Sequence, residues 1–241
     1  MLFLATLMNE HDLATGFLWF LAFLFSTTVH EAMHAWAAMK GGDLTAYHGG
    51  QVSLSPVPHI QREPIGMLVL PLLTAMTQGW AIGWASAPYD PHWAARYPKR
   101  AAVMAAAGPI GNLILAIIAF VLLKVGLNTG WFVAPTRVSF SAVVESTAGG
   151  PVEFVAALLS IFLMLNVLLF AFNLLPLPPL DGSAVLGLVL PQSQAIALQQ
   201  YTAQPWLQIL GLAIAWKFFP LLSGPMFALV LALLHPGESY R

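Results

Sequence analysis

The chain has 241 residues, of which 59% are hydrophobic and 8% charged, whereas soluble domains average about 45–50% and about 25%. A soluble globular protein is therefore excluded. Nine Lys and Arg residues against ten Asp and Glu residues give a formal charge of −1, so no basic surface is available to hold a nucleic acid backbone. Because the sequence contains no Cys, any metal site has to be built from His and carboxylate side chains.

Long apolar runs predict an all-α, polytopic helical membrane protein of about five to six spans. A membrane β-barrel would instead show short segments of alternating hydrophobicity. In chain order, the predicted spans cover residues 13–39, 66–86, 101–123, 152–175 and 206–235. Pro220, Gly224 and Pro225 interrupt the last run, which is therefore either one kinked span or two half-spans.

The intervals between the spans predict loops and one short strand. Apolar and polar residues alternate after the first span, where Val52 and Leu54 are the apolar ones, so we predict a small membrane-associated β element near residues 50–58. Loops are expected around 87–100, 124–151 and 192–204, with a short apolar segment at 184–190. Lys and Arg residues divide equally between alternate loops, which leaves the orientation in the membrane open.

We expect one integral membrane domain over residues 1–241, with a core over 15–190 and C-terminal accessory helices over 191–241. The longest polar interval, 124–151, is too short to hold a separate domain.

The strongest chemical motif is H-E-x-x-H at residues 30–34, in the second half of the first span. The i,i+4 spacing places His30 and His34 on one helix face, where they can hold one zinc ion. Glu31 lies beside them, as a general base requires. Ionisable residues at a helix centre in the bilayer cost about 2.5–3.5 kcal/mol each, and zinc binding is strong enough to offset that cost. The alternative is that these are polar residues packed between helices.

Catalytic zinc needs a third protein ligand. Apart from Glu31 and Asp181, the acidic residues lie in polar stretches or at a helix start. Asp181 follows the proline cluster at 176–179, and irregular backbone at membrane depth is tolerated only beside protein or a water-filled cavity. Taken alone, Asp181 is equally well explained as the cap of a helix beginning near Ser183. Beside the histidine pair, we favour zinc ligation.

Several other polar side chains are candidates for supporting roles. Asn166 and Asn173 are seven residues apart, hence on one helix face, and a buried amide needs a partner. Interhelical hydrogen bonding is the default for both. For Asn173, eight residues before Asp181, the functional hypothesis is a donor to the scissile carbonyl or its oxyanion. For Asn112, helix packing is favoured and a contact with the site is the alternative, and His59 is kept as a candidate for a supporting contact.

The motifs HEAMH within a span, AAAGPIGN in a later span and NLLPLPPLDG after it, in this order, resemble the site-2 protease family of intramembrane zinc metalloproteases. The resemblance covers residues 15–190 and is specific because the motifs occur together. No PDZ-like domain fits into these loops or the tail, so the chain resembles the compact members of the family. Carried over by motif, the resemblance implies zinc ligation by His30, His34 and Asp181, one Zn²⁺ per chain, Glu31 as catalytic base, and Asn173 as the substrate-orienting or oxyanion residue.

The resemblance implies hydrolysis of a peptide bond in or near the transmembrane segment of a membrane protein, with Glu31 activating a water on the zinc. The expected partners are that substrate and the lipid bilayer, without nucleic acid, and the expected location is the cell membrane of a prokaryote. Two other classes stay open. A metal transporter would distribute His and carboxylates along a path through several helices, and a non-catalytic membrane binding module would usually lack the base or a ligand.

Overall fold

The computed structural model describes residues 10–238 and residue 240. Within these residues, four helices are long and apolar enough to cross a membrane. They are α2 (Glu10–Gly41), α7 (Pro98–Asn128), α8 (Pro151–Asn173) and α11 (Pro205–Leu234). The predicted class, an all-α polytopic membrane protein, is confirmed, whereas the prediction of five to six spans is wrong.

Two local features explain the smaller number of spans. The run predicted as the second span forms only the apolar helix Ile65–Gln78, made of the π-helical turn η1 (Ile65–Val69) and α5 (Leu70–Gln78). It reaches about 21 Å, short of the roughly 30 Å hydrocarbon core, because Gly79 ends it in a left-handed conformation with φ +76°. The last run is one continuous helix, α11, despite its internal prolines.

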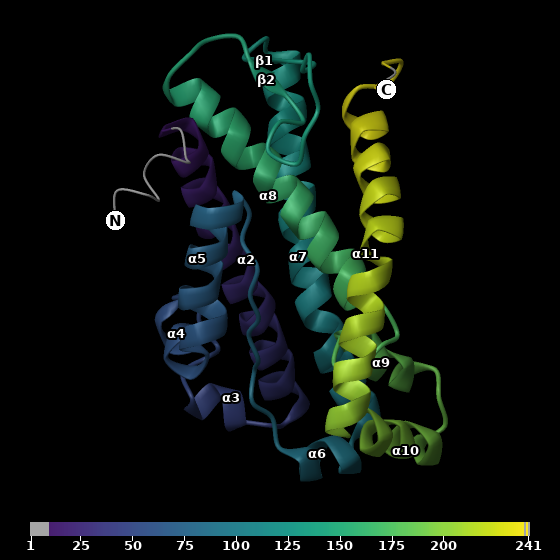
Figure 1. The fold of residues 1–241 in the computed structure, drawn as a ribbon. Coiled ribbons are helices and arrows are strands. Elements are labelled where there is room, and N and C mark those ends of the chain that lie inside the picture. The colour runs from purple at the N-terminus through teal and green to yellow at the C-terminus, as the bar shows by residue number, and fades with distance from the viewer. Residues whose placement is uncertain (1–9, 239, 241) are drawn as a thin grey trace.

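The four long helices form a bundle with α7 at its centre. Helix α7 packs against both α2 and α8, α5 lies beside α2, and α11 packs on the other side of α8 (Figure 1). Short helices gather toward one end of the bundle. They are α3 (Thr45–His48), α4 (Val57–Arg62), α6 (Pro91–Arg96), α9 (Asp181–Val185) with the 3₁₀ turn η2 (Leu186–Leu188), and α10 (Gln192–Thr202). The loop predicted at 192–204 is therefore wrong, because most of it is α10.

The predicted β element near residues 50–58 is also wrong. Residues 51–56 form bends rather than a strand, and α4 begins at Val57. Serine hydroxyls accept the backbone amides locally, from Ser55 to Ser53 Oγ at 3.0 Å and from Val57 to Ser55 Oγ at 3.4 Å. Such bonds compete with a strand ladder. Alternation of residue types alone therefore did not predict the backbone here.

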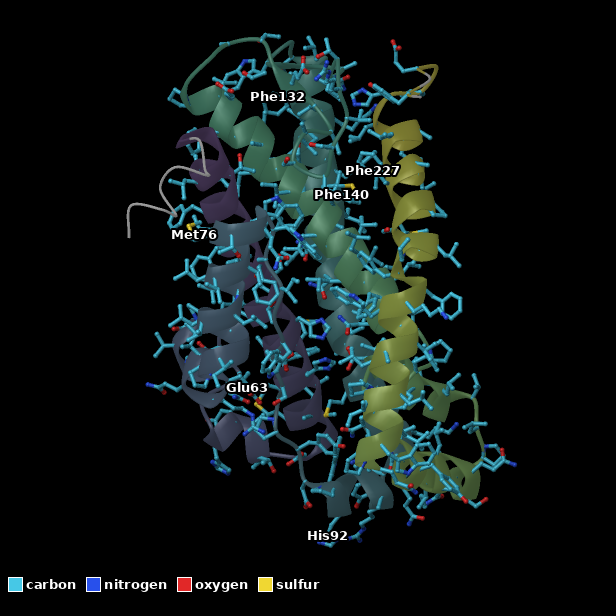
Figure 2. All side chains as sticks on the ribbon, in the orientation of Figure 1. Glu63, Met76, His92, Phe132, Phe140 and Phe227 are labelled. Carbon is cyan, nitrogen blue, oxygen red and sulfur yellow. The ribbon has the colours of Figure 1, made fainter. Side chains whose placement is uncertain are left out.

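The strands of the described residues lie at the opposite end, where β1 (Phe132–Val133) pairs antiparallel with β2 (Glu145–Ser146). Their loop is held by an aromatic core. Phe132 is buried against α7, and the rings of Phe140 and Phe227 lie 5.0 Å apart (Figure 2). This core joins the end of α7 to α11.

At the site-bearing end, Asp43 ties the end of α2 to the segment before α6. Its carboxylate accepts from the Thr45 amide at 2.9 Å and hydroxyl at 2.6 Å, and from the Asp90 amide at 2.8 Å. Burial acts to raise the pKa of Asp43, but these hydrogen bonds outweigh it and lower the pKa overall. The ionised carboxylate therefore stabilises the fold.

Replacing Asp43 by Ala should lower the free energy of unfolding by about 1–3 kcal/mol at pH 7, because three hydrogen bonds to a charged acceptor are lost. Since the folded pKa is depressed, this stabilisation is present above the unfolded pKa near about 3.9 and is lost as the pH falls through the folded value. Unfolding titrations in mixed micelles at several pH values can measure it. Glu153→Ala removes an exposed carboxylate and serves as the control. Equal losses in the two variants would contradict the prediction.

Candidate metal centre

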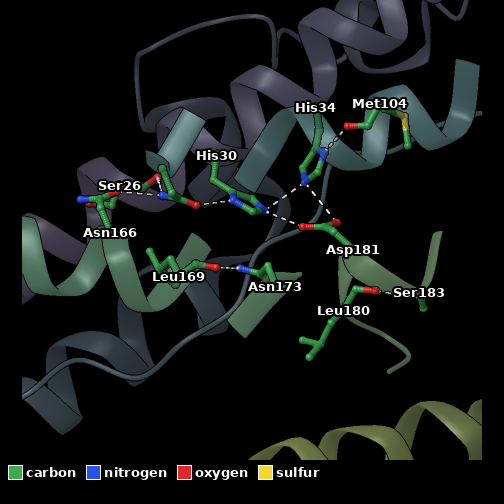
Figure 3. A network of polar contacts seen from close by, with 11 residues as sticks. Ser26, His30, His34, Met104, Asn166, Leu169, Asn173, Leu180, Asp181 and Ser183 are labelled. Atoms are coloured by element: carbon green, nitrogen blue, oxygen red, sulfur yellow. Dashed lines mark hydrogen bonds and ion pairs between the residues drawn. The ribbon is translucent and has the colours of Figure 1, made fainter. Parts of the chain in front are cut away.

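The two histidines of the motif face the same point in the bundle. His30 and His34 stand one turn apart on α2 and are 7% and 6% exposed. Their rings are edge-on with centroids 4.6 Å apart, and their Nε2 atoms are 3.0 Å apart (Figure 3). The first span therefore presents two nitrogen donors side by side.

Asp181 completes a cluster of three donors. Its Oδ2 lies 3.2 Å from His30 Nε2 and its Oδ1 lies 3.3 Å from His34 Nε2 (Figure 3). The alternative role as a helix cap is not what the structure shows, because Leu180 is the N-cap of α9 and no side chain caps that helix. The Asp181 side chain turns instead toward α2.

Close backbone packing brings Asp181 back to the histidines after α8 ends. A Cβ on Gly182 would collide with the backbone of Leu174 and Leu175, so α9 folds directly onto the end of α8. On the other side, a Cβ on Gly211 of α11 would collide with the carbonyl of Pro178. Because two glycines allow this close backbone contact, the proline segment is fixed between α8 and α11, and with it the position of the carboxylate that follows.

Glu31 lies next to the three donors without being engaged by the protein. Its side chain is 4% exposed, and a carboxylate oxygen lies within 4.8 Å of the imidazole nitrogens. Its Oε2 atom is buried and has no hydrogen-bond partner among the residues that the structure describes. A buried carboxylate oxygen without a partner is costly, so this atom is available to a molecule that the site would bind.

The donor set fits a zinc ion. Separations of 3.0–3.3 Å between the Nε2 and carboxylate atoms suit donors that share a tetrahedral ion at about 2.0–2.2 Å. His34 Nδ1 lies 2.8 Å from the Met104 carbonyl. A carbonyl can only accept, so Nδ1 carries a proton, and in the neutral ring Nε2 presents its lone pair to the other donors.

A glycine on α7 leaves the space in front of these donors free. A Cβ on Gly108 would lie 2.7 Å from His30 Nε2 and closer still to His34 Nε2. Ordinary Cβ contacts are much longer, so any side chain here would occupy the space at which the imidazoles are directed. Gly108 belongs to the AAAGPIGN motif, and its role was not predicted from the sequence.

The Asn173 side chain hydrogen-bonds within its own helix. Its Nδ2 donates to the Leu169 carbonyl, 3.0 Å away and one turn back on α8 (Figure 3). Asn166, by contrast, makes the interhelical hydrogen bonds predicted for it, to Ser26 and Asn112. His59 Nε2 instead bonds the Ser53 carbonyl, 3.1 Å away, within the 51–62 segment.

Asn112 reaches the site, which is the alternative to helix packing that the sequence left open. Its Oδ1 lies 2.6 Å from His30 Nδ1. The signal was an amide in an apolar span next to a small-residue motif, but nothing in the sequence shows which helix the amide faces.

The apolar bundle and the converging His, His and Asp side chains define an integral membrane protein with a zinc-type site. The chain belongs to peptidase family M50, whose family model matches residues 18–218. The resemblance to the site-2 protease family is thereby confirmed, and Zn²⁺ is the cofactor that the family and the donor set imply.

Bacterial proteins with related sequences agree with this family. The chain is 34% identical over 169 residues to "Putative zinc metalloprotease YwhC" of Bacillus subtilis, which covers 70% of this chain and 67% of that protein. It is 32% identical over 221 residues to "Putative zinc metalloprotease Rip2" of Mycobacterium tuberculosis, with 90% and 73% covered. No solved structure is significantly similar to the chain.

Proposed function

We propose that this protein is an intramembrane zinc metalloprotease that hydrolyses a peptide bond in or near the transmembrane segment of another membrane protein. The observation that carries the proposal is the buried Oε2 atom of Glu31, which has no partner among the described residues and lies in a span beside the two imidazoles on which Asp181 converges. A purely structural metal site would not need that carboxylate.

In this proposal, His30, His34 and Asp181 hold the ion. Bound there, Zn²⁺ would act as a Lewis acid that makes a water nucleophilic near neutral pH and polarises the scissile carbonyl. Glu31 takes up the proton of the attacking water on its free Oε2 and later returns it to the leaving amine nitrogen. The new C–O bond forms first, as the water oxygen adds to the carbonyl carbon, and the C–N bond breaks once the nitrogen has taken up the proton, so a carboxyl and an amine are released.

The surroundings of α2 support an apolar substrate. An apolar groove of about 440 Å³ lies between α2, α7 and α8. A second groove of about 210 Å³ shares Leu21 and Phe25 with it and extends to Thr28, Leu54 and Pro56. Thr28 lies two residues before His30, so the apolar groove reaches the part of α2 next to the motif.

A metal transporter is the less favoured reading. Among the described residues, the only group of three or more His, Asp or Glu side chains close enough to share a metal ion is His30, Glu31 and His34. Asp181 lies against that same group. A transport path would need further metal-binding groups along the spans. A non-catalytic module is also less favoured, because the base and all three candidate ligands are present.

Purified protein in proteoliposomes, supplied with a panel of single-span membrane proteins, tests the proposal. We expect cleavage within or near a span, loss of cleavage after chelation, and recovery when zinc is added. A parallel assay with a zinc-sensitive dye inside the liposomes measures zinc flux. Zinc flux without cleavage of any panel member would favour the transporter and contradict the protease.

The proposal extends to domain organisation and location. We propose one membrane protease domain, with its core over 15–190 and accessory helices over 191–241. Its place is the cell membrane of a prokaryote, supported by the bacterial relatives. Its partners are a transmembrane protein substrate and the lipid bilayer.

Asn173→Ala should retain zinc and lose about 10²–10³ in turnover, the usual scale for an oxyanion donor. For this role the amide has to exchange its bond to the Leu169 carbonyl for one to the substrate. Asn128→Ala, at the exposed end of α7, is the matched control. A wild-type rate for Asn173→Ala would leave this residue with a local helix bond only.

A further inference from the structure

We propose that Asn112 is a positioning residue of the metal centre, which keeps the proton of His30 on Nδ1 and so directs the Nε2 lone pair at the ion. The inference rests on the proposed metal site and goes beyond it, since it concerns a residue on a different helix that binds no metal itself. Its basis is a buried chain of hydrogen bonds that runs from His30 into the bundle.

This hydrogen-bond chain consists of three fully buried polar side chains behind His30. Asn112 on α7, Asn166 on α8 and Ser26 on α2 are all 0% exposed. His30 Nδ1 lies 2.6 Å from Asn112 Oδ1, Asn112 Nδ2 lies 2.9 Å from Asn166 Oδ1, and Asn166 Nδ2 lies 2.9 Å from Ser26 Oγ (Figure 3). The hydrogen-bond chain therefore links the three central spans.

Backbone carbonyls determine which way each amide faces. Asn166 Nδ2 is 2.8 Å from the Phe162 carbonyl, which can only accept, so this end of the Asn166 amide has to be its NH₂ group. Its oxygen then faces Asn112. The Asn112 NH₂ group has to face that oxygen, and the Ser26 carbonyl at 3.4 Å is a second acceptor on the same side.

The Asn112 oxygen is left facing His30. Since that oxygen is also only an acceptor, His30 Nδ1 has to be the donor, and in the neutral ring Nε2 carries the lone pair. His34 reaches the same state through the Met104 carbonyl. The position of the proton is thus fixed by a backbone carbonyl in His34 and by a side chain in His30. Only the side chain, Asn112, can be removed by mutation.

Zinc affinity in detergent, measured by competition with a chelator, tests this role independently of cleavage. We expect Asn112→Leu to bind zinc about 10–100-fold more weakly, the usual effect of losing the partner of a metal-binding histidine. Asn112→Asp keeps the acceptor for Nδ1, although it loses the donor to Asn166, and should recover most of that loss in zinc affinity at some cost in melting temperature. The absorption spectrum of bound Co²⁺ should be altered in the Leu variant and close to wild type in the Asp variant.

Ser160→Ala is the matched control. Ser160 is also 0% exposed and bonds the Val143 amide and the Ala156 carbonyl, on the part of α8 before Asn166. We expect it to lower the melting temperature of the metal-free protein, as Asn112→Leu does, without changing zinc affinity. A purely structural role of Asn112 would weaken zinc binding in both variants to the extent that each is destabilised.

Three results would overturn the inference: wild-type zinc affinity in Asn112→Leu, an equal loss in Ser160→Ala, or an Asp variant as weak as the Leu variant. Failure of the proposed protease function is distinguishable, since absent cleavage with the expected zinc affinities leaves the role of Asn112 intact. A wild-type protein that binds no zinc would overturn both.

Discussion

Replacing Glu31 by Gln should lower the rate of peptide cleavage by about 10²–10⁴, the contribution of a general base, while zinc content stays at the wild-type level. Gln keeps the size of the side chain and leaves His30, His34 and Asp181 in place. It removes the oxygen that accepts the proton, which is the buried Oε2 atom without a partner among the described residues. Zinc analysis and cleavage in proteoliposomes measure the two effects on one preparation.

Glu153→Gln is the control for this experiment, since it makes the same change at an exposed acid at the start of α8. It should cleave at the wild-type rate. The Glu31 variant should also retain uncleaved substrate in a pull-down, because binding does not depend on the proton acceptor. Cleavage by Glu31→Gln at the wild-type rate would show that another group is the base, and the proposed mechanism would be wrong.

Gly108→Ala should abolish zinc binding, and cleavage with it, although it adds one methyl group. The new Cβ would lie 2.7 Å from His30 Nε2 and nearer to His34 Nε2, so at least one imidazole has to turn away from the ion. The effect on the helix is separate: Ala is favoured over Gly within a helix by about 1 kcal/mol, but the new Cβ also crowds the ring of Pro109, which follows directly in α7. Zinc analysis and the melting temperature of the metal-free protein separate the two effects.

Gly111→Ala is a control of the same chemistry one turn further along α7. Its Cβ would meet the Met33 side chain at 2.9 Å, and Met is flexible enough to move. We expect near-normal zinc content there. Retention of zinc by Gly108→Ala would show that the ion does not lie where the imidazoles converge.

The convergence of His30, His34 and Asp181 could be predicted from the sequence because the information for it is local. The spacing of His30 and His34 fixes their common helix face, and Asp181 was the one carboxylate left at membrane depth after the polar stretches were set aside. Both inferences need only the period of a helix and the cost of burying charge. The structure accordingly places all three side chains together.

What the sequence could not predict depends on contacts between distant segments. To predict the contact between Asn112 and His30, one has to know how α7 is rotated relative to α2. To predict the space in front of Gly108, one has to know how far apart these two helices lie. The strand predicted near 50–58 was wrong because alternation does not reveal whether a partner strand exists, and serine hydroxyls took its amides. The apolar run at 66–86 is likewise long enough for a span in the sequence, but the helix ends before Gly79, whose left-handed conformation stops it.

The contact between Gly211 and Pro178 places α11 directly against the segment that leads to Asp181. Most of this helix faces outward, and it carries none of the candidate ligands. The backbone of α11 contacts the proline segment with no side chain between them, so Pro178 cannot move toward α11. A chain that ended before residue 205 would lose this contact, which lies three residues before Asp181. We therefore expect the C-terminal helix to help hold the Asp181 carboxylate in position, in addition to crossing the membrane.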